Sequence, residues 1–162
     1  MSALVVIHGK DRGRFFNVPR EAALVLGRDE SLLARLHDPS VSRRHLEFIH
    51  HETDGKCYAV DLQSRNGARI NRERLNHSQE LRDGDIIHFG HTLVVFVNKT
   101  LDADSPIGTF LKACEKLYAE DLKKIRDHEA KRAAAKAEAN EGSMSGRTGV
   151  LNFGSIFGKK VT

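Results

Sequence analysis

The sequence contains little cysteine and few aromatic residues. Cys57 and Cys114 are its two cysteines among 162 residues, and tryptophan is absent. The cysteines fall in different predicted structural units and lack the spacing of metal ligands, so the sequence predicts neither a disulfide framework nor a zinc site. This cysteine usage fits a reducing compartment. We therefore expect a cytoplasmic protein with no metal and no cofactor.

Long apolar runs are missing as well. No run approaches the roughly 18 apolar residues that a membrane-spanning helix requires. The N-terminal run ALVVI is shorter than a signal-peptide core of about 7 to 15 residues, and no basic leader precedes it. The sequence therefore predicts neither membrane insertion nor export.

Clustered charge of one sign is also missing. The net charge is +4, with a pI near 9.2, and the basic excess divides equally between residues 1–100 and the rest. Nucleic-acid binding requires clustered basic charge, or aromatic side chains that stack on single strands. Aromatic residues make up 6% of the chain. Nucleic-acid binding is therefore an alternative that the composition disfavours.

The patterns of catalytic sites are absent. The nine histidines include the pair His50 and His51, but none has a metal-binding spacing such as HExxH. The sequence has no nucleophile elbow and no glycine-rich phosphate loop before a helix. We therefore predict no catalytic residue and expect a binding protein rather than an enzyme.

The sequence does contain, over residues 3–98, a series of short segments rich in β-forming residues. Turn signals such as Asn66-Gly67 and Asp83-Gly84 separate them. Many short strands at this spacing are typical of an antiparallel β-sandwich or barrel of about 100 residues. We predict strands in the segments ALVVIH, RFFNV, AALVLG, HLEFIHH, KCYAVDL, ARIN, DIIHFG and TLVVFV.

Two of these segments show an apolar side. Leu46 and Phe48 share one side of the segment HLEFIHH. Tyr58, Val60 and Leu62 share one side of the segment KCYAVDL. Successive side chains of a strand point to opposite faces, so we expect these two sets to face the core. On such a scaffold, functional residues are expected in the loops at one end.

The pattern changes near residue 100, where a helix is predicted. Ser105 is a candidate cap, and Pro106 suits the first helical position. Apolar residues then recur at spacings of three and four, which places them in one stripe on a helix. We predict a C-terminal α-helix over residues 105–139, with a stripe made of Ile107, Phe110, Leu111, Cys114, Leu117, Tyr118, Leu122 and Ile125.

Three fates are open for this stripe. It packs on the sandwich, it pairs with a second copy through residues 105–126, or it stays unpacked. Self-association would make the protein an oligomeric scaffold. The remaining residues, 140–162, are rich in glycine and serine, so we expect a disordered tail with a short docking motif around residues 150–157.

Three loop segments beside predicted strands stand out: LGRDE (26–30), SVSRRH (40–45) and QSRNG (63–67). Each alone has an ordinary explanation as a solvated charge, a turn hydroxyl or a hairpin signal. In this order, followed by INRERL and LRDGDIIHFG, they resemble the forkhead-associated (FHA) domain. The resemblance covers residues 3–98, about 60% of the chain.

The resemblance implies an FHA domain over residues 1–99 whose loops bind phosphothreonine peptides. The predicted fold class is therefore all-β, an antiparallel FHA-like sandwich of about eleven strands, followed by the amphipathic helix and the flexible tail. FHA proteins commonly act downstream of Ser/Thr kinases. The implied partner is a phosphothreonine-containing protein in such a pathway, and the implied function is its recruitment.

The resemblance assigns phosphate binding to three residues. Arg28 matches the arginine of the GR motif, and Ser42 matches the serine of the SxxH motif, whose hydroxyl donates to a phosphate oxygen. Arg43 adds a further phosphate contact. A phosphothreonine carries about −1.5 to −2 charge and three acceptor oxygens, which a planar guanidinium binds with more directional hydrogen bonds than a lysine.

The resemblance implies that residues 63–67 contact the bound peptide. Asn66 matches the family asparagine, whose amide bonds main-chain groups beside the phosphothreonine. Ser64 supports the loop or touches the phosphate region. Arg65 stands where threonine is common, which leaves the sequence preference open, with acidic residues near the phosphosite as one outcome.

Three residues are expected to support the site. Gly27 precedes the arginine of the GR motif, and the His45 ring bonds loop groups to hold Ser42 in place. Gly67 permits the positive φ that a tight turn needs. In the tail, Thr148 is a candidate internal ligand, because a phosphate there would reach the chain's own pocket at high effective concentration.

Overall fold

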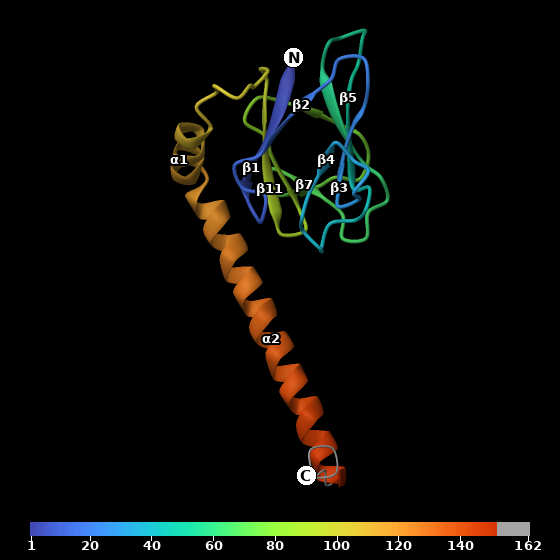
Figure 1. Cartoon of the computed structure of the whole chain (residues 1–162), viewed down its shortest axis with the longest axis vertical. Coiled ribbons are helices and arrows are strands. Elements are labelled where there is room, and N and C mark those ends of the chain that lie inside the picture. The colour runs from blue at the N-terminus through green and yellow to red at the C-terminus, as the bar shows by residue number, and fades with distance from the viewer. Residues whose placement is uncertain (152–162) are drawn as a thin grey trace. The chain divides into compact units, whose positions relative to one another are not determined.

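The computed structural model of this chain describes residues 1–151, with side chains up to residue 139 (Figure 1). The chain divides into two units, residues 1–117 and the part that begins at Tyr118. The first is a β-sandwich followed by the helix α1 (Ile107–Leu117), and the second contains the helix α2 (Ala119–Leu151). The sandwich and the helical region after it are as predicted, although two helices make all-β only an approximate class.

Two sheets form the sandwich. Neighbouring strands are antiparallel except at one edge, where β3 and β4 run parallel and Leu26 pairs with Ala34. The prediction of a purely antiparallel sandwich is wrong at this edge, because residues 28–33 carry the chain back before β4 begins. In spatial order, one sheet contains β2 (Phe15–Val18), β1 (Ser2–His8), β11 (Thr92–Val97), β10 (Ile86–Phe89), β7 (Arg69–Ile70) and β8 (Glu73–Arg74), and the other contains β4 (Ala34–Arg35), β3 (Leu24–Gly27), β5 (Leu46–His50), β6 (Cys57–Asp61) and β9 (Gln79–Leu81).

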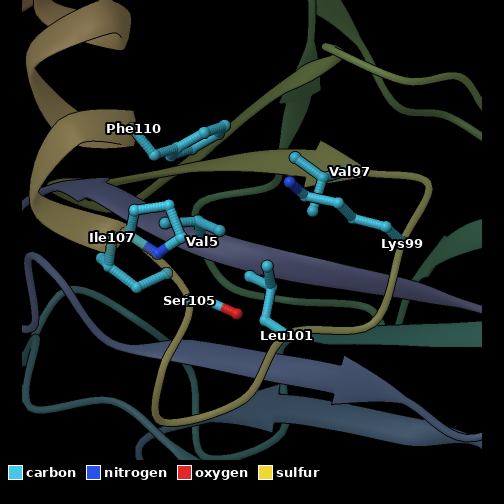
Figure 2. A pocket seen from close by; sticks show the side chains of 8 residues that line it. Val5, Val97, Lys99, Leu101, Ser105, Ile107 and Phe110 are labelled. Carbon is cyan, nitrogen blue, oxygen red and sulfur yellow. The ribbon is translucent and has the colours of Figure 1, made fainter.

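The core lies between the two sheets, and one sheet is covered on both faces. Leu4 and Val6 of β1 belong to the core cluster. Val5, on the opposite face of β1, lines a small apolar pocket with Ile107 and Phe110 of α1 (Figure 2). A strand with two covered faces can be a continuous apolar run, which explains ALVVI.

The predicted inward face of β5 is correct, but that of β6 is wrong. Leu46 and Phe48 are fully buried. In β6 the side chain opposite Phe48 is Ala59, so Ala59 shares the inward face of Phe48. Tyr58 and Val60 lie half-buried on the outer face. A small alanine opposite a large phenylalanine fits the core. The larger side chains of Tyr58 and Val60 lie on the outer face of β6.

Helix α1 packs on the sandwich, which is the first of the three fates considered for the stripe. Leu111 and Cys114 are buried. Arg12, in the turn after β1, forms an ion pair with Glu115 of α1, with N and O atoms 2.7 Å apart. Self-association through residues 105–126 stays a prediction.

The single helix predicted over residues 105–139 is two helices in the structure. α1 ends at Leu117, and α2 begins at Ala119 and extends to Leu151, so α2 overlaps the predicted tail. The Ser105 hydroxyl donates to Asp102 Oδ1 at 3.0 Å, within the turn that precedes α1. Residues 152–162, with most of the predicted docking motif, and the side chain of Thr148 lie outside the described residues.

Among residues 1–139, whose side chains the structure describes, no group of three or more His, Cys, Asp or Glu residues is placed to hold a metal ion. Cys57 and Cys114 are free thiols, and burial raises the pKa of each to about 11. Neither helix in this part of the chain is long and apolar enough to cross a membrane.

At the end of β3, the backbone lies against residues 43–44 with no room for a side chain. A Cβ at position 27 would overlap the carbonyl oxygen of Arg43. The Gly27 backbone therefore approaches this loop as only glycine can. The approach lets the amide of Arg28 donate to the Ser42 carbonyl at 3.1 Å, and the amide of Asp29 donate to the Arg43 carbonyl at 3.2 Å.

Gly27→Ala should lower the free energy of unfolding by about 1 to 3 kcal/mol, because the added methyl group forces the two segments apart. Urea denaturation, monitored by far-UV circular dichroism, measures the change in the free energy of unfolding. Gly108→Ala is the matched control, since nothing lies within 4 Å of its added Cβ. Alanine there should leave stability unchanged or raise it by up to about 1 kcal/mol. Equal effects of the two substitutions would contradict the close approach.

Candidate functional site

The three loop segments singled out in the sequence meet at one end of the sandwich. Residues 28–29 bond to residues 42–43 through their backbones. The amide of Arg65 donates to the Ser42 Oγ at 3.0 Å. These contacts join segments that are far apart in the sequence. We call the assembly of residues 27–29, 40–45 and 63–67 the loop site.

Arg28 and Ser42 are neighbours in the loop site. The Arg28 side chain is exposed and has no hydrogen-bond or ion-pair partner in the described part of the chain. The Ser42 hydroxyl oxygen accepts from the Arg65 amide, which leaves its own proton available for donation. Arg28 thus carries an unpaired guanidinium and Ser42 a free hydroxyl proton, on two segments joined by the hydrogen bond from the Arg28 amide to the Ser42 carbonyl, and Arg43 is exposed on the second of these segments.

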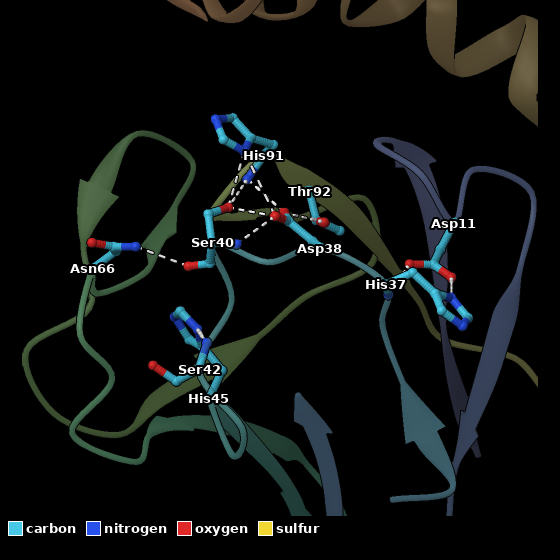
Figure 3. Close-up of polar contacts among 9 residues, drawn as sticks. All are labelled: Asp11, His37, Asp38, Ser40, Ser42, His45, Asn66, His91 and Thr92. Atoms are coloured by element: carbon cyan, nitrogen blue, oxygen red, sulfur yellow. Dashed lines mark hydrogen bonds and ion pairs between the residues drawn. The ribbon is translucent and has the colours of Figure 1, made fainter. Parts of the chain in front are cut away.

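His45 joins two of the three segments from inside. Its ring is fully buried and lies 5.1 Å from the ring of Phe89. Nδ1 accepts from the Ser42 amide at 3.0 Å (Figure 3). Nε2 donates to the Gly67 carbonyl oxygen, also at 3.0 Å. These two partners select the neutral tautomer with its proton on Nε2.

The electrostatics of His45 agree with this tautomer. Burial lowers the pKa of His45 below its usual value, against the opposing effects of the Gly67 carbonyl and the carboxylates of Asp61 and Asp38. The imidazole is therefore uncharged at neutral pH, as acceptance at Nδ1 requires. His45 lies where it holds the Ser42 backbone against the turn at Gly67.

The 63–67 turn is fixed by a serine and a carboxylate. The Ser64 hydroxyl donates to Asp61 Oδ2 at 2.9 Å and accepts from the Gly67 amide at 3.0 Å. Gly67 has a φ of +72°. Because both functions of the Ser64 hydroxyl are occupied, the structure favours the loop-supporting role over a phosphate contact.

Asn66 lies exposed at this turn with one end engaged. Its Nδ2 donates to the carbonyl oxygen of Ser40 at 2.8 Å (Figure 3). Its Oδ1 has no partner among the residues that the structure describes. A side chain held at one end and open at the other can read a peptide backbone laid across the loops.

A buried carboxylate that the sequence reasoning missed supports the serine loop. Asp38 accepts from the amides of Ser40 and His91, at 2.9 and 2.7 Å, and from the Thr92 hydroxyl at 2.9 Å (Figure 3). Burial alone would raise the pKa of Asp38, but these hydrogen bonds outweigh it and hold the pKa below the usual range. The signal was the segment DPS, since an aspartate often bonds the amide two residues later.

A second buried carboxylate holds the start of the same loop. Asp11 accepts from the His37 amide and from His37 Nδ1, each at 2.6 Å (Figure 3), and from Arg14 at 2.8 Å. The two carboxylates thus fasten residues 37–40 to the sandwich. The loop site is held in place by the fold rather than by a ligand.

Arg74 is a further site residue that the sequence reasoning missed. A Cβ built at Gly67 would lie 2.9 to 3.3 Å from its guanidinium atoms, so this group rests against the Gly67 backbone. Arg74 lies in β8, outside the three loop segments. Its position in INRERL gave no signal, because strand spacing does not show which loop a long side chain reaches.

Comparisons with known proteins identify the family. The FHA domain model matches residues 24–90. The FHA domain-containing protein FhaA of Mycobacterium tuberculosis is 38% identical over 84 residues, which are 51% of this chain and 15% of that protein. The oxoglutarate dehydrogenase inhibitor of Corynebacterium jeikeium is 39% identical over 101 residues, which are 62% of this chain and 67% of that protein. This chain spans 63% of the same-named protein of Corynebacterium diphtheriae.

Solved structures give the same result. A chain from a study of phosphothreonine-dependent FHA domain interactions is 29% identical with a TM-score of 0.53, over 62% of this chain and 98% of that one. The FhaA FHA domain, complexed with the intracellular domain of Rv3910, is 29% identical with a TM-score of 0.52, over 59% of this chain and 99% of that one. The fold, the order of the loop residues and these similarities agree, and this chain belongs to the FHA domain family, whose members are non-catalytic modules that bind phosphothreonine peptides.

Proposed function

We propose that this protein binds phosphothreonine-containing proteins through the loop site and so recruits substrates of Ser/Thr kinases. The observation that carries the proposal is that Arg28, with an unpaired guanidinium, is bonded through its backbone to Ser42, whose hydroxyl proton is unused. A phosphate monoester presents three acceptor oxygens with a charge of about −1.5 to −2 at neutral pH. The donor set complements this ligand in both charge and number.

Each residue has a distinct role in the proposed complex. Arg28 donates to the phosphate in a planar fork, and Ser42 donates one further hydrogen bond. Arg43 adds positive charge beside them. Asn66 bonds the main chain next to the phosphothreonine, while Arg65 faces solvent at the edge of the site.

The energetics fit a reversible signal. Hydrogen bonds to a charged group contribute about 1.5 to 3 kcal/mol each. Two or three of them, with backbone contacts, offset the cost of association and give micromolar affinity, near −8 kcal/mol. Most of this free energy depends on the phosphate, so dephosphorylation releases the partner.

Gly27, His45, Ser64 and Gly67 act through position rather than contact. Gly27 allows β3 to approach the serine loop, and Ser64 and Gly67 shape the asparagine turn. His45 links the two loops through its neutral ring. Donors held in advance of binding lose little conformational freedom when the ligand arrives, which raises affinity.

Arg28→Ala should abolish binding of a phosphothreonine peptide in calorimetry and leave the fold intact, because the exposed side chain makes no hydrogen bond or ion pair with the described residues. The matched control is Arg82→Ala, which removes the same charge from a side chain that is 81% exposed, 3.6 Å from Glu80. Arg82 lies with His50 and Cys57, at the ends of β5 and β6 opposite to the loop site. It should retain wild-type affinity. Peptides with threonine or glutamate in place of phosphothreonine should not bind. Undiminished affinity in a folded Arg28→Ala protein would overturn the proposal.

The His45 ring should stay neutral below its ordinary pKa of about 6.5, because burial lowers its pKa. The folded-state pKa is lowered, so the folded protein binds fewer protons than the unfolded chain as the pH falls below 6.5. Stability should therefore decline from that pH down to the folded pKa.

An NMR titration of the ring measures the pKa directly and also reports the tautomer. The ring should show the Nε2–H form at neutral pH. Titration at or above pH 6.5, or a proton on Nδ1, would contradict the bridging role. The titration uses the protein without a phosphopeptide, so the second ionisation of phosphothreonine, near pH 6, does not affect the result.

A further inference from the structure

We propose that Arg74 is a specificity residue that binds an acidic side chain of the partner, close to the phosphothreonine. The inference rests on the proposed function and extends it to the class of peptide selected. Its starting point is the guanidinium of Arg74 against the Gly67 backbone, next to the asparagine that reads the peptide.

The position of Arg74 is set by packing, while its charge is unused. The guanidinium lies where a side chain at position 67 would be, so glycine makes room for it. In the described part of the chain, Arg74 has no hydrogen-bond or ion-pair partner. Several other exposed cations are paired, such as Arg12 with Glu115 and Lys56 with Glu80. A guanidinium held in place with free donors is suited to a carboxylate.

The strand pairing of Arg74 costs stability, which favours a role in binding. In the β7–β8 hairpin, Arg74 lies directly opposite Arg69. Like charges at such a position are destabilising. An acidic residue at either position would relieve the repulsion. An arrangement that weakens a hairpin without a structural benefit is typical of a functional site.

The charged residues near Arg74 favour a negatively charged ligand. Arg28, Arg43 and Arg65 are exposed on the joined loops, and Arg74 lies against the turn that bears Asn66. The phosphate occupies Arg28 and Arg43 in the proposed complex. Arg65 projects from a loop, whereas Arg74 is supported by Gly67, so Arg74 loses less freedom on binding a carboxylate.

The test is a set of phosphothreonine peptides that carry one aspartate, or the neutral isostere asparagine, at each flanking position in turn. Calorimetry with the full chain should show one or two positions where aspartate tightens binding by about threefold to fivefold, the range of an exposed ion pair. Arg74→Ala should remove this preference and leave the affinity for the asparagine peptides within about twofold. Added salt should reduce the preference, since exposed charges are screened.

Arg82→Ala is again the matched control, because it removes one positive charge at the ends of β5 and β6 opposite to the loop site. It should keep the full preference for aspartate. Loss of the preference in Arg82→Ala as well would assign the effect to net charge and overturn the role of Arg74. So would a preference that survives Arg74→Ala, or the absence of any preference in the wild-type protein.

These outcomes are separate from failure of the proposed function. If no phosphothreonine peptide binds the wild-type chain, the loop site is not a phosphopeptide site and both proposals fail. If the peptides bind with equal affinity whatever their flanking charge, only the inference about Arg74 fails.

Arg74→Gln is a second test variant, because glutamine removes the charge and keeps a polar side chain in the β7–β8 hairpin. It should lose the preference for aspartate as Arg74→Ala does.

Discussion

The loop site depends on one buried imidazole. His45 accepts from the backbone of the serine loop and donates to the backbone of the asparagine turn, so a single neutral ring fixes the spacing of the two loops. A charged ring would lose the first of these bonds. Burial keeps the ring neutral by lowering its pKa. The donors that face a ligand are therefore positioned by a group that never touches it.

The sandwich supplies the remaining constraints around this ring. Gly27 lets β3 lie against the serine loop, and the carboxylates of Asp11 and Asp38 fasten the start of that loop. Both carboxylates are buried, and both take several hydrogen bonds, which is how a buried charge is tolerated. The exposed arginines contribute little to this framework. The chain thus separates residues that build the site from residues that remain free to bind.

The sandwich and the loop residues could be predicted from the sequence because short motifs identify them. GR, SxxH and NG mark positions whose chemistry is local, and the structure brings those positions together. Asp38 was missed because its partners His91 and Thr92 are distant in the sequence. Arg74 was missed because strand spacing does not show which loop a long side chain reaches. The inward face of β6 was wrong because Ala59 is small, and apolar size does not show which face a partner strand covers. The break at Tyr118 had no signal, since the apolar stripe continues through it.

The central claim is that Arg28 and Ser42 grip one phosphate while His45 keeps its two loop contacts. A crystal structure of the protein with a bound phosphothreonine peptide tests this most directly. The account predicts phosphate oxygens within about 2.6 to 3.0 Å of both the Arg28 guanidinium and the Ser42 Oγ, with the His45 Nε2 still on the Gly67 carbonyl. A phosphate bound elsewhere on the sandwich, or bound without either side chain, would contradict it.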